Sequence, residues 1–227
     1  MKEIVIFYHI FLENDWKKIL IEQVNKLIEF KLDLVSDIKI GVVYSRFSEE
    51  DQSDLISILN KLNNFEIILN SPNNSIGEGQ TIKKIKEFCD KLTSKLKIFY
   101  FHTKGISQQH SVREIPVNEW RKMMEFFLLE KWENCTQKLD EGYDCCGVNY
   151  QNHAGNINGE IKLIKIFNGN FFWTNSDYIK KIDKNFLFET RYSAENWILS
   201  VDHNVYSFFD TPLSVNLYYD IIKDYKN

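Results

Sequence analysis

Residues 97–105 read Lys-Ile-Phe-Tyr-Phe-His-Thr-Lys-Gly, and this stretch carries the strongest indication of the fold. An apolar, β-rich run stops abruptly at His102-Thr103-Lys104-Gly105. In an open α/β sheet, ligands bind in the crevice outside the carboxyl ends of the strands. A buried strand with this ending delivers hydrogen-bond donors and one positive charge to that crevice, where they suit a phosphate or a departing oxyanion. The alternative interpretation is a strand followed by an ordinary polar turn.

Apolar β-rich runs alternate with helical patterns throughout the first half of the chain. The predicted strands span residues 5–11, 38–44, 65–69 and 96–101, and the predicted helices span 15–30, about 51–62, and 81–92. Ser48 followed by Asp51 resembles the N-cap of the second helix. Strand–helix units of this length predict a parallel sheet with right-handed crossovers.

The second half has a different texture. It begins with a long amphipathic helix predicted over Val117–Leu139, and a polar, flexible segment follows at Gln151–Gly159. Further strands are predicted at 144–150 and 161–167, with short helices at 176–182 and near 194–200. No shift in composition marks a domain boundary, so we expect one domain over residues 1–227.

Composition and charge exclude several classes of protein. The chain has 227 residues, of which 44% are hydrophobic, and a net charge of -4, which argues against broad binding of nucleic acid or anionic membranes. The longest apolar run, Ile4–Leu12, is too short to span a bilayer and lacks the features of a signal peptide. The four cysteines show no metal-binding or redox spacing, so free thiols in a reducing compartment are expected. We therefore expect a cytoplasmic protein.

Five motifs occur in an order typical of one family. They are Tyr100-Phe101-His102-Thr103-Lys104-Gly105, then Trp120-Arg121, then Gly142-Tyr143-Asp144-Cys145-Cys146-Gly147-Val148-Asn149, then His153, then Gly169-Asn170-Phe171-Phe172-Trp173. This set resembles a little-described group of glycosyltransferases with a GT-A-like fold, often associated with genes for cell-surface polysaccharides. The resemblance spans roughly Tyr8 to Trp197, and its HTKG and GNFFW segments are the most specific.

The resemblance implies a GT-A-like α/β domain with a Rossmann-type, mostly parallel sheet flanked by helices. Residues 1–105 would form the nucleotide-binding half and residues 106–227 the acceptor-side half. It also implies transfer of a sugar from a nucleotide-sugar donor to a glycan or other hydroxyl acceptor, in glycan or polysaccharide synthesis. Two alternatives stay open: a nucleotide-binding module or nucleotidyltransferase, and a non-catalytic scaffold on the same fold.

Many GT-A enzymes carry an Asp-x-Asp after the fourth strand that holds Mn²⁺ or Mg²⁺ against the diphosphate. Here His102-Thr103-Lys104 stands at that place, and a positioned lysine can neutralise part of the charge on the departing group. We predict that Lys104 contacts a phosphate and that His102 is a second donor. The alternative is that Lys104 pairs with a carboxylate in its loop. If a metal binds, His203 is the candidate ligand.

Inverting transfer needs a base that removes the proton from the acceptor hydroxyl. In inverting GT-A enzymes this base stands near the start of an acceptor-side helix, and Glu195 occupies such a place, with Ser193 as its predicted cap. The alternative is that Glu195 only complements the helix dipole. Glu189 and Asp177 are the other candidates for the base.

The donor is expected to contact the ends of the first and fourth strands. Tyr8 and His9 are predicted to end the first strand near the nucleotide, with a buried core position as the alternative. Thr81 belongs to Gly77-Glu78-Gly79-Gln80-Thr81, which precedes the third helix, and helix N-termini bind anions or ribose hydroxyls readily. Thr103 and Gly105 complete the predicted donor site.

The predicted sugar or acceptor pocket draws on the second half. Gly169 permits close backbone approach, Asn170 can read hydroxyls, and Trp173 offers a ring for stacking on a sugar face. His153 is expected to reach the site when a lid closes. Core packing is the alternative for the aromatic residues. Arg121 is expected to be an exposed arginine, with a phosphate contact as its alternative.

Overall fold

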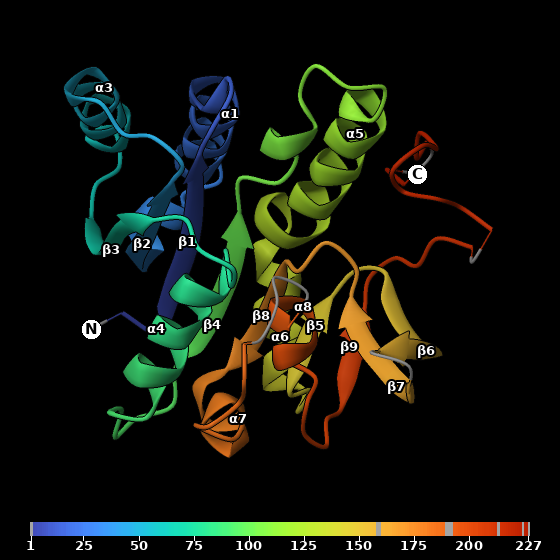
Figure 1. The fold of residues 1–227 in the computed structure, drawn as a ribbon. Coiled ribbons are helices and arrows are strands. Elements are labelled where there is room, and N and C mark those ends of the chain that lie inside the picture. The colour runs from blue at the N-terminus through green and yellow to red at the C-terminus, as the bar shows by residue number, and fades with distance from the viewer. Residues whose placement is uncertain (1, 158–159, 189–192, 213, 224, 227) are drawn as a thin grey trace.

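A seven-stranded sheet in the order β3-β2-β1-β4-β8-β5-β9 forms the centre of the molecule (Figure 1). The computed structural model describes residues 2–157, 160–188, 193–212, 214–223 and 225–226. The strands are β1 (Ile4–Leu12), β2 (Ser36–Tyr44), β3 (Phe65–Pro72), β4 (Lys97–His102), β5 (Cys145–Gly147), β8 (Phe172–Asn175) and β9 (Val205–Ser207). Strands β3, β2, β1 and β4 are parallel, and β8 runs antiparallel to both of its neighbours. The expected α/β fold with a mostly parallel sheet is therefore confirmed.

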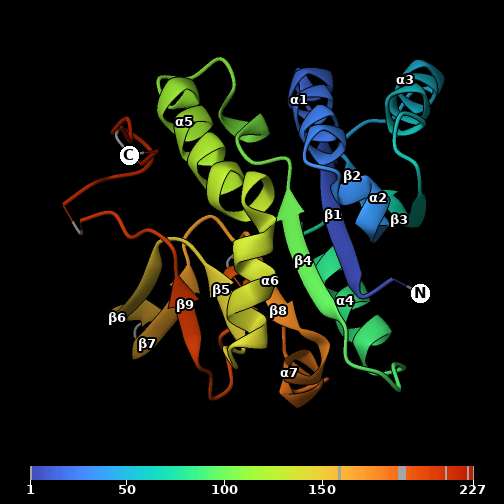
Figure 2. The same cartoon turned by 180° about the vertical axis from the view of Figure 1, so that it is seen from behind.

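Helices cover both faces of this sheet (Figures 1 and 2). One face packs against α1 (Trp16–Glu29), α2 (Leu32–Val35), α3 (Glu49–Leu59), α5 (Glu114–Glu125), η2 (Phe126–Glu130) and α6 (Trp132–Asp140). The other packs against α4 (Gly79–Cys89), α7 (Ser176–Lys181) and α8 (Ser193–Trp197). A separate hairpin consists of β6 (Tyr150–Ile157) and β7 (Glu160–Phe167), and a short turn, η1 (Ile106–Gln108), follows β4.

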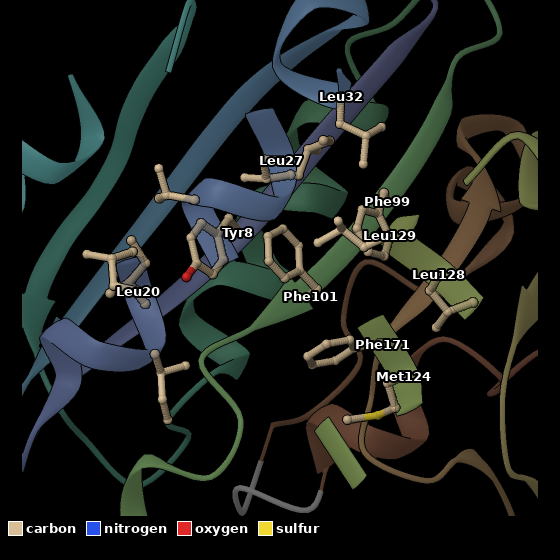
Figure 3. Close-up of a cluster of buried hydrophobic side chains, with 14 of the residues drawn as sticks. Tyr8, Leu20, Leu27, Leu32, Phe99, Phe101, Met124, Leu128, Leu129 and Phe171 are labelled. Atoms are coloured by element: carbon tan, nitrogen blue, oxygen red, sulfur yellow. The ribbon is translucent and has the colours of Figure 1, made fainter. Parts of the chain in front are cut away.

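The two faces of β1 explain its nearly continuous apolar sequence. Side chains alternate along a strand, so Ile6 and Tyr8 belong to the core on the α1 side, whereas Val5 and Phe7 belong to the core on the α4 side. Burial on both faces requires apolar residues at successive positions. Figure 3 shows the α1-side core, in which side chains of β1 and β4 lie among those of α1, α5 and η2.

Two expectations for the second half are wrong. The predicted helix over 117–139 is interrupted, because a π-helical turn separates α5 from α6 and Lys131 leaves helical geometry at φ -111° and ψ 39°. The polar segment 151–159 is not a loop over most of its length, because β6 pairs antiparallel with β7. The pairing runs from Tyr150 opposite Phe167 to Ile157 opposite Glu160.

Among the described helices, none combines the length and apolar character that a membrane-crossing segment requires.

Candidate functional site

A pocket with a volume of about 200 Å³ lies at the carboxyl ends of β1 and β4. Its wall combines the ends of these strands with the loop after β3, the start of α4, α8 and the C-terminal segment. The predicted site residues that line it are His9, His102, Thr103, Lys104, Gly105 and Glu195. Asn73, Asn74, Ser75, Gly77, Glu78 and Tyr218 are among the remaining lining residues. The structure thus brings residues from distant parts of the sequence to the strand ends, where ligands of open α/β sheets bind.

Lys104 supplies a positive charge to this pocket. Its Nζ atom lies 3.9 Å from the centroid of the Trp120 ring and 5.9 Å from that of Tyr218. Such cation–π contacts hold an ammonium group while leaving its charge intact. Gly105, directly after it, has φ +99°, a left-handed conformation that favours glycine. This turn redirects the chain from β4 into η1.

Thr103 fixes the loop to β1. Its Oγ1 accepts a hydrogen bond from the Phe11 amide at 2.9 Å, and its own amide donates to the His9 carbonyl at 3.1 Å. This geometry bears on the Mn²⁺ or Mg²⁺ that the resemblance to GT-A enzymes raised, since such hard cations prefer several oxygen ligands. The stretch 102–104 offers an imidazole, a hydroxyl that already accepts a bond, and an ammonium group. This donor set does not fit a divalent metal.

Within the described ranges, no three His, Cys, Asp or Glu side chains converge in a geometry that could hold a metal ion.

His102 and His9 lie side by side across β1 and β4, with ring centroids 6.5 Å apart. His102 Nε2 is 3.0 Å from the Gly169 carbonyl oxygen, which can only accept, so this nitrogen carries a hydrogen. His9 is buried and its Nδ1 is 2.8 Å from Thr81 Oγ1. Burial lowers the pKa of His9 to about 4, so His9 is neutral at pH 7. Thr81, predicted as a donor contact, is not among the residues that line the pocket, and its hydroxyl contacts His9.

Glu78 is a pocket residue that the sequence interpretation missed. It precedes α4 without capping it, and its Oε2 accepts hydrogen bonds from Tyr100 Oη at 2.7 Å and Asn170 Nδ2 at 3.2 Å. Burial raises the pKa of Glu78, but the nearby His102 and His9 and the Tyr100 hydroxyl outweigh burial and leave the pKa below its usual value. The prediction for residues 77–81 considers only the backbone groups at the start of the helix. The signal in the sequence that indicates Glu78 is an acidic side chain just before a helix, in a glycine-containing loop after a strand.

Glu195 enters the pocket from α8. Of the two alternatives for the base, Asp177 lies on α7, where it pairs with Lys180 at an exposed site outside the pocket. Glu189 lies outside the described residues. Glu195 and Glu78 are therefore the carboxylates that line the described wall of the pocket.

Tyr8 and Trp173 lie in the core and do not line the pocket. The Tyr8 hydroxyl donates to Gln23 Oε1 at 2.7 Å, and its ring stacks on Phe101 on the α1 side of the sheet. Trp173 is completely buried, and its Nε1 donates to the Leu128 carbonyl at 2.7 Å. β1 extends to Leu12, one residue beyond the strand predicted over 5–11, so Tyr8 and His9 lie within the strand rather than at its last residue.

His153 and His203 also lie outside the pocket lining. His153 is an exposed residue of β6. The two ring nitrogens of His203 lie 2.7 Å from the Val201 carbonyl and 3.4 Å from Tyr150 Oη. Neither histidine is brought to Lys104 or Glu195.

Gly169 and Asn170 do not line the pocket, but they contact residues that do. Both have positive φ, +97° and 58°, and the Asn170 side chain is buried. Asn170 Nδ2 donates to Glu78 and to the Ala194 carbonyl at 3.3 Å, so it ties the start of α4 to α8. Gly169 contributes its carbonyl to His102. These residues therefore position Glu78 and His102, which line the pocket.

Arg121 is not the exposed arginine that the sequence suggested. Its side chain is 1% exposed and forms ion pairs with Glu125 at 2.8 Å and Glu22 at 2.6 Å. These contacts place the guanidinium inside the α1–α5 layer, outside the wall of the pocket.

The fold and the pocket define the chain as an α/β protein with a charged pocket at the carboxyl ends of parallel strands. A model described as "Domain of unknown function (DUF8361)" matches residues 7–207, so the chain belongs to the DUF8361 family. The matched range contains every lining residue of the pocket except Tyr218. No curated protein matches the chain.

Similar solved structures include two with low identity. One, from Desulfovibrio desulfuricans G20, carries the provisional description of a nucleotide-diphospho-sugar transferase. It is 11% identical, with a TM-score of 0.45, and the match covers 92% of this chain and 81% of that one. The other, 4-diphosphocytidyl-2C-methyl-D-erythritol synthase, is 10% identical, with a TM-score of 0.36. That match covers 91% of this chain and 89% of the other.

Proposed function

We propose that this protein is an inverting glycosyltransferase that moves a sugar from a nucleotide-sugar donor to an acceptor hydroxyl in glycan or polysaccharide synthesis. The observation that carries the proposal is the single pocket in which Lys104 and His102 lie with Glu78 and Glu195. Sugar transfer from a nucleoside diphosphate requires positive charge at the leaving group and a base at the acceptor. This pocket offers both kinds of group.

Lys104 and His102 are assigned to the diphosphate. As the bond between the anomeric carbon and the phosphate oxygen breaks, negative charge grows on the departing nucleoside diphosphate. A lysine held over Trp120 is positioned before the reaction, so its charge stabilises the leaving group without reorganisation. The carboxyl end of β4 sets this position for both residues.

Glu195 is assigned as the base. The acceptor oxygen attacks the anomeric carbon and forms the new bond, and its proton passes to the Glu195 carboxylate. Glu78 is less suited to this step, because its Oε2 already accepts hydrogen bonds from Tyr100 and Asn170, and its pKa is lowered. Substrate-bound geometry would place the acceptor on the α8 side of the pocket.

The test begins with binding. Calorimetry of the purified protein with nucleoside diphosphates and nucleotide-sugars should show preference for one nucleotide, and Lys104→Ala should weaken that binding by about tenfold, equivalent to about 1.4 kcal/mol. Lys84→Ala is the matched control, because Lys84 pairs with Glu87 on α4 outside the pocket. A protein that binds none of these nucleotides would not be this transferase.

The second step of the test measures turnover. Glu195→Gln should lower the release of nucleoside diphosphate from the donor, in the presence of an acceptor mixture, by about 10²–10⁴-fold and leave donor affinity within about threefold. Glu87→Gln is the control for loss of a carboxylate at an exposed site. Nucleotide binding without any turnover would instead support a binding module on this fold.

A further inference from the structure

We infer that Glu78 holds His102 in its protonated, cationic form, so that the pocket presents two positive charges, on His102 and Lys104, to the phosphates of its ligand. The identity of that ligand as a nucleoside diphosphate rests on the proposed function, whereas the charge of His102 does not. Glu78 then acts through His102 and is a positioning residue.

The contacts of the His102 ring favour the cation. Its Nε2–H points to the Gly169 carbonyl oxygen at 3.0 Å, and Glu78 Oε2 lies 3.8 Å from the same nitrogen. A carboxylate within about 4–6 Å stabilises the charged form of an imidazole, and a carbonyl acceptor accommodates the N–H in either protonation state. The His102 side chain is only 14% exposed, so solvent screens this interaction little.

Glu78 is built to remain a carboxylate. Its Oε2 accepts hydrogen bonds from the Tyr100 hydroxyl and the Asn170 amide, both of which stabilise a negative charge. It lies at the N-terminal end of α4, where the helix dipole also favours an anion. The carboxylate does not cap the helix and is directed to the histidine side instead.

The groups around His102 on the other elements have mixed charges. On β1, His9 is neutral because burial lowers its pKa, and on β4, burial raises the pKa of Tyr100, so Tyr100 is also neutral. From α1, Gln23 donates to the His102 carbonyl and carries no charge. Lys104 in the following loop disfavours a second cation, whereas Glu78, directly before α4, favours it. Glu195 on α8 is the other carboxylate among the described lining residues.

The balance of these charges matters for an anionic ligand. Among the described lining residues, the carboxylates of Glu78 and Glu195 disfavour a phosphate and the ammonium group of Lys104 favours it. A proton on His102 adds a second positive charge to this set. Because His9 stays neutral, His102 is the ring of this adjacent pair that carries the proton.

This arrangement predicts an unusual sign for one substitution. Glu78→Gln removes a negative charge from a pocket for anions, and direct electrostatics alone would strengthen anion binding. If Glu78 maintains the His102 cation, the same substitution deprotonates His102 at neutral pH. The neutral ring keeps its Nε2–H on the Gly169 carbonyl and has a lone pair instead of an N–H at Nδ1, so it offers a phosphate one donor fewer and binding weakens. Gln is nearly isosteric with Glu, and its amide oxygen still accepts from Tyr100.

Proton NMR of the full, ligand-free chain tests the charge of His102 directly. The His102 Cε1 proton is assigned by its loss in His102→Gln, and its shift is followed from pH 5 to 9. We expect a midpoint above pH 7 in the wild type and a fall of about one unit or more in Glu78→Gln, against an ordinary value of about 6.5. Glu87→Gln is the matched control and should leave the midpoint unchanged.

A wild-type midpoint below about 6.5, or a midpoint that Glu78→Gln leaves in place, would overturn the inference. The exposed His110 serves as the internal check, since its titration should be the same in every variant that folds. Glu78→Asp, which keeps the charge, should retain at least part of the elevation.

Calorimetry with inorganic pyrophosphate tests the consequence for binding. At pH 7.5, Glu78→Gln should bind pyrophosphate about tenfold more weakly than the wild type. At pH 5.5, where His102 is protonated in both, this weakening should vanish or reverse, because only the negative charge of Glu78 then differs. The ratio at each pH cancels the ionisation of pyrophosphate itself. Tighter binding by Glu78→Gln at pH 7.5 would overturn the inference. A raised His102 midpoint without pyrophosphate binding would support the cation and count against the proposed function alone.

Discussion

Two groups of charged side chains lie near the carboxyl end of β4, and they differ in their access to solvent. The sealed cluster is the ion pair of Arg121 and Glu125, whose side chains are only 1% and 0% exposed. The pocket cluster consists of Glu78, His102, Lys104 and Glu195, which line a cavity. A charge without access to water must be compensated by protein groups, whereas charges at a cavity can exchange partners with a ligand. The comparison separates charges that stabilise the fold from charges available for binding.

Gln23 connects the two clusters. Its Nε2 donates to Glu125 Oε1 at 2.8 Å and to the His102 carbonyl at 3.2 Å, while its Oε1 accepts from Tyr8. The sealed cluster thereby holds the last residue of β4 from the α1 side. The position of His102 in the pocket cluster therefore depends on hydrogen bonds of Gln23, a residue that does not line the pocket.

The largest expected effect is in the sealed cluster. Arg121→Met leaves the Glu125 carboxylate buried without its closest cation, so the free energy of unfolding should fall by about 3–5 kcal/mol. Equilibrium unfolding in urea measures this change. The double variant Arg121→Met/Glu125→Leu should regain most of the loss, because it buries no uncompensated charge. A loss below about 1 kcal/mol in Arg121→Met would show that the cluster is not sealed from water.

The next effect concerns His9, which combines features of both clusters because it lines the pocket and is itself buried. Its pKa is about 4 in the folded state and 6.5 in the reference state, so between these values the unfolded chain binds a proton that the folded chain does not. Stability therefore rises with pH across this window, and acidification from pH 7 to pH 4 should cost up to roughly 3 kcal/mol through His9.

The measurement for His9 is urea unfolding at pH 4.5 and 7.5 in the wild type and in His9→Gln. The variant should lose part of the pH dependence, because it lacks the group that takes up the proton on unfolding. An equal pH dependence in both proteins would show that His9 takes up its proton over the same pH range in the folded and the unfolded chain, so that burial does not lower its pKa.

The fold was predictable from the sequence where periodicity and burial agree. The apolar run of β1 and the strand–helix alternation up to β4 follow from a parallel sheet covered on both faces. The interruption at 126–130 was not predictable, because its sequence Phe-Phe-Leu-Leu-Glu contains neither glycine nor proline. Trp173 donates to the Leu128 carbonyl in this turn, and such a contact between distant residues leaves no local signal.

The residues of the candidate site were predictable where they end a strand, and not where they depend on contacts between distant segments. The ending of β4 indicated Lys104 and His102, and a strand-end position indicated His9. Neighbouring residues of a strand face opposite sides, and the sequence does not indicate which face of β1 borders the pocket. The prediction therefore groups Tyr8 with His9, although Tyr8 faces α1. Glu78 was missed because its contacts with Tyr100, Asn170 and His102 join segments that the sequence keeps far apart.

The smallest expected effect concerns Gly169, whose carbonyl holds His102 of the pocket cluster. In Gly169→Ala the new Cβ would lie 2.5 Å from Met124 Sδ and 3.0 Å from the Trp120 ring, in addition to the cost of φ +97°. We expect a loss of about 1–3 kcal/mol in urea unfolding. Gly142→Ala is the matched control, since Gly142 has φ +101° with nothing within 4 Å of its added Cβ, so it isolates the backbone cost. Equal losses in the two variants would show that the Trp120 and Met124 side chains yield to the methyl group, and that the wall behind His102 is less rigid than the sealed cluster on the other side of β4.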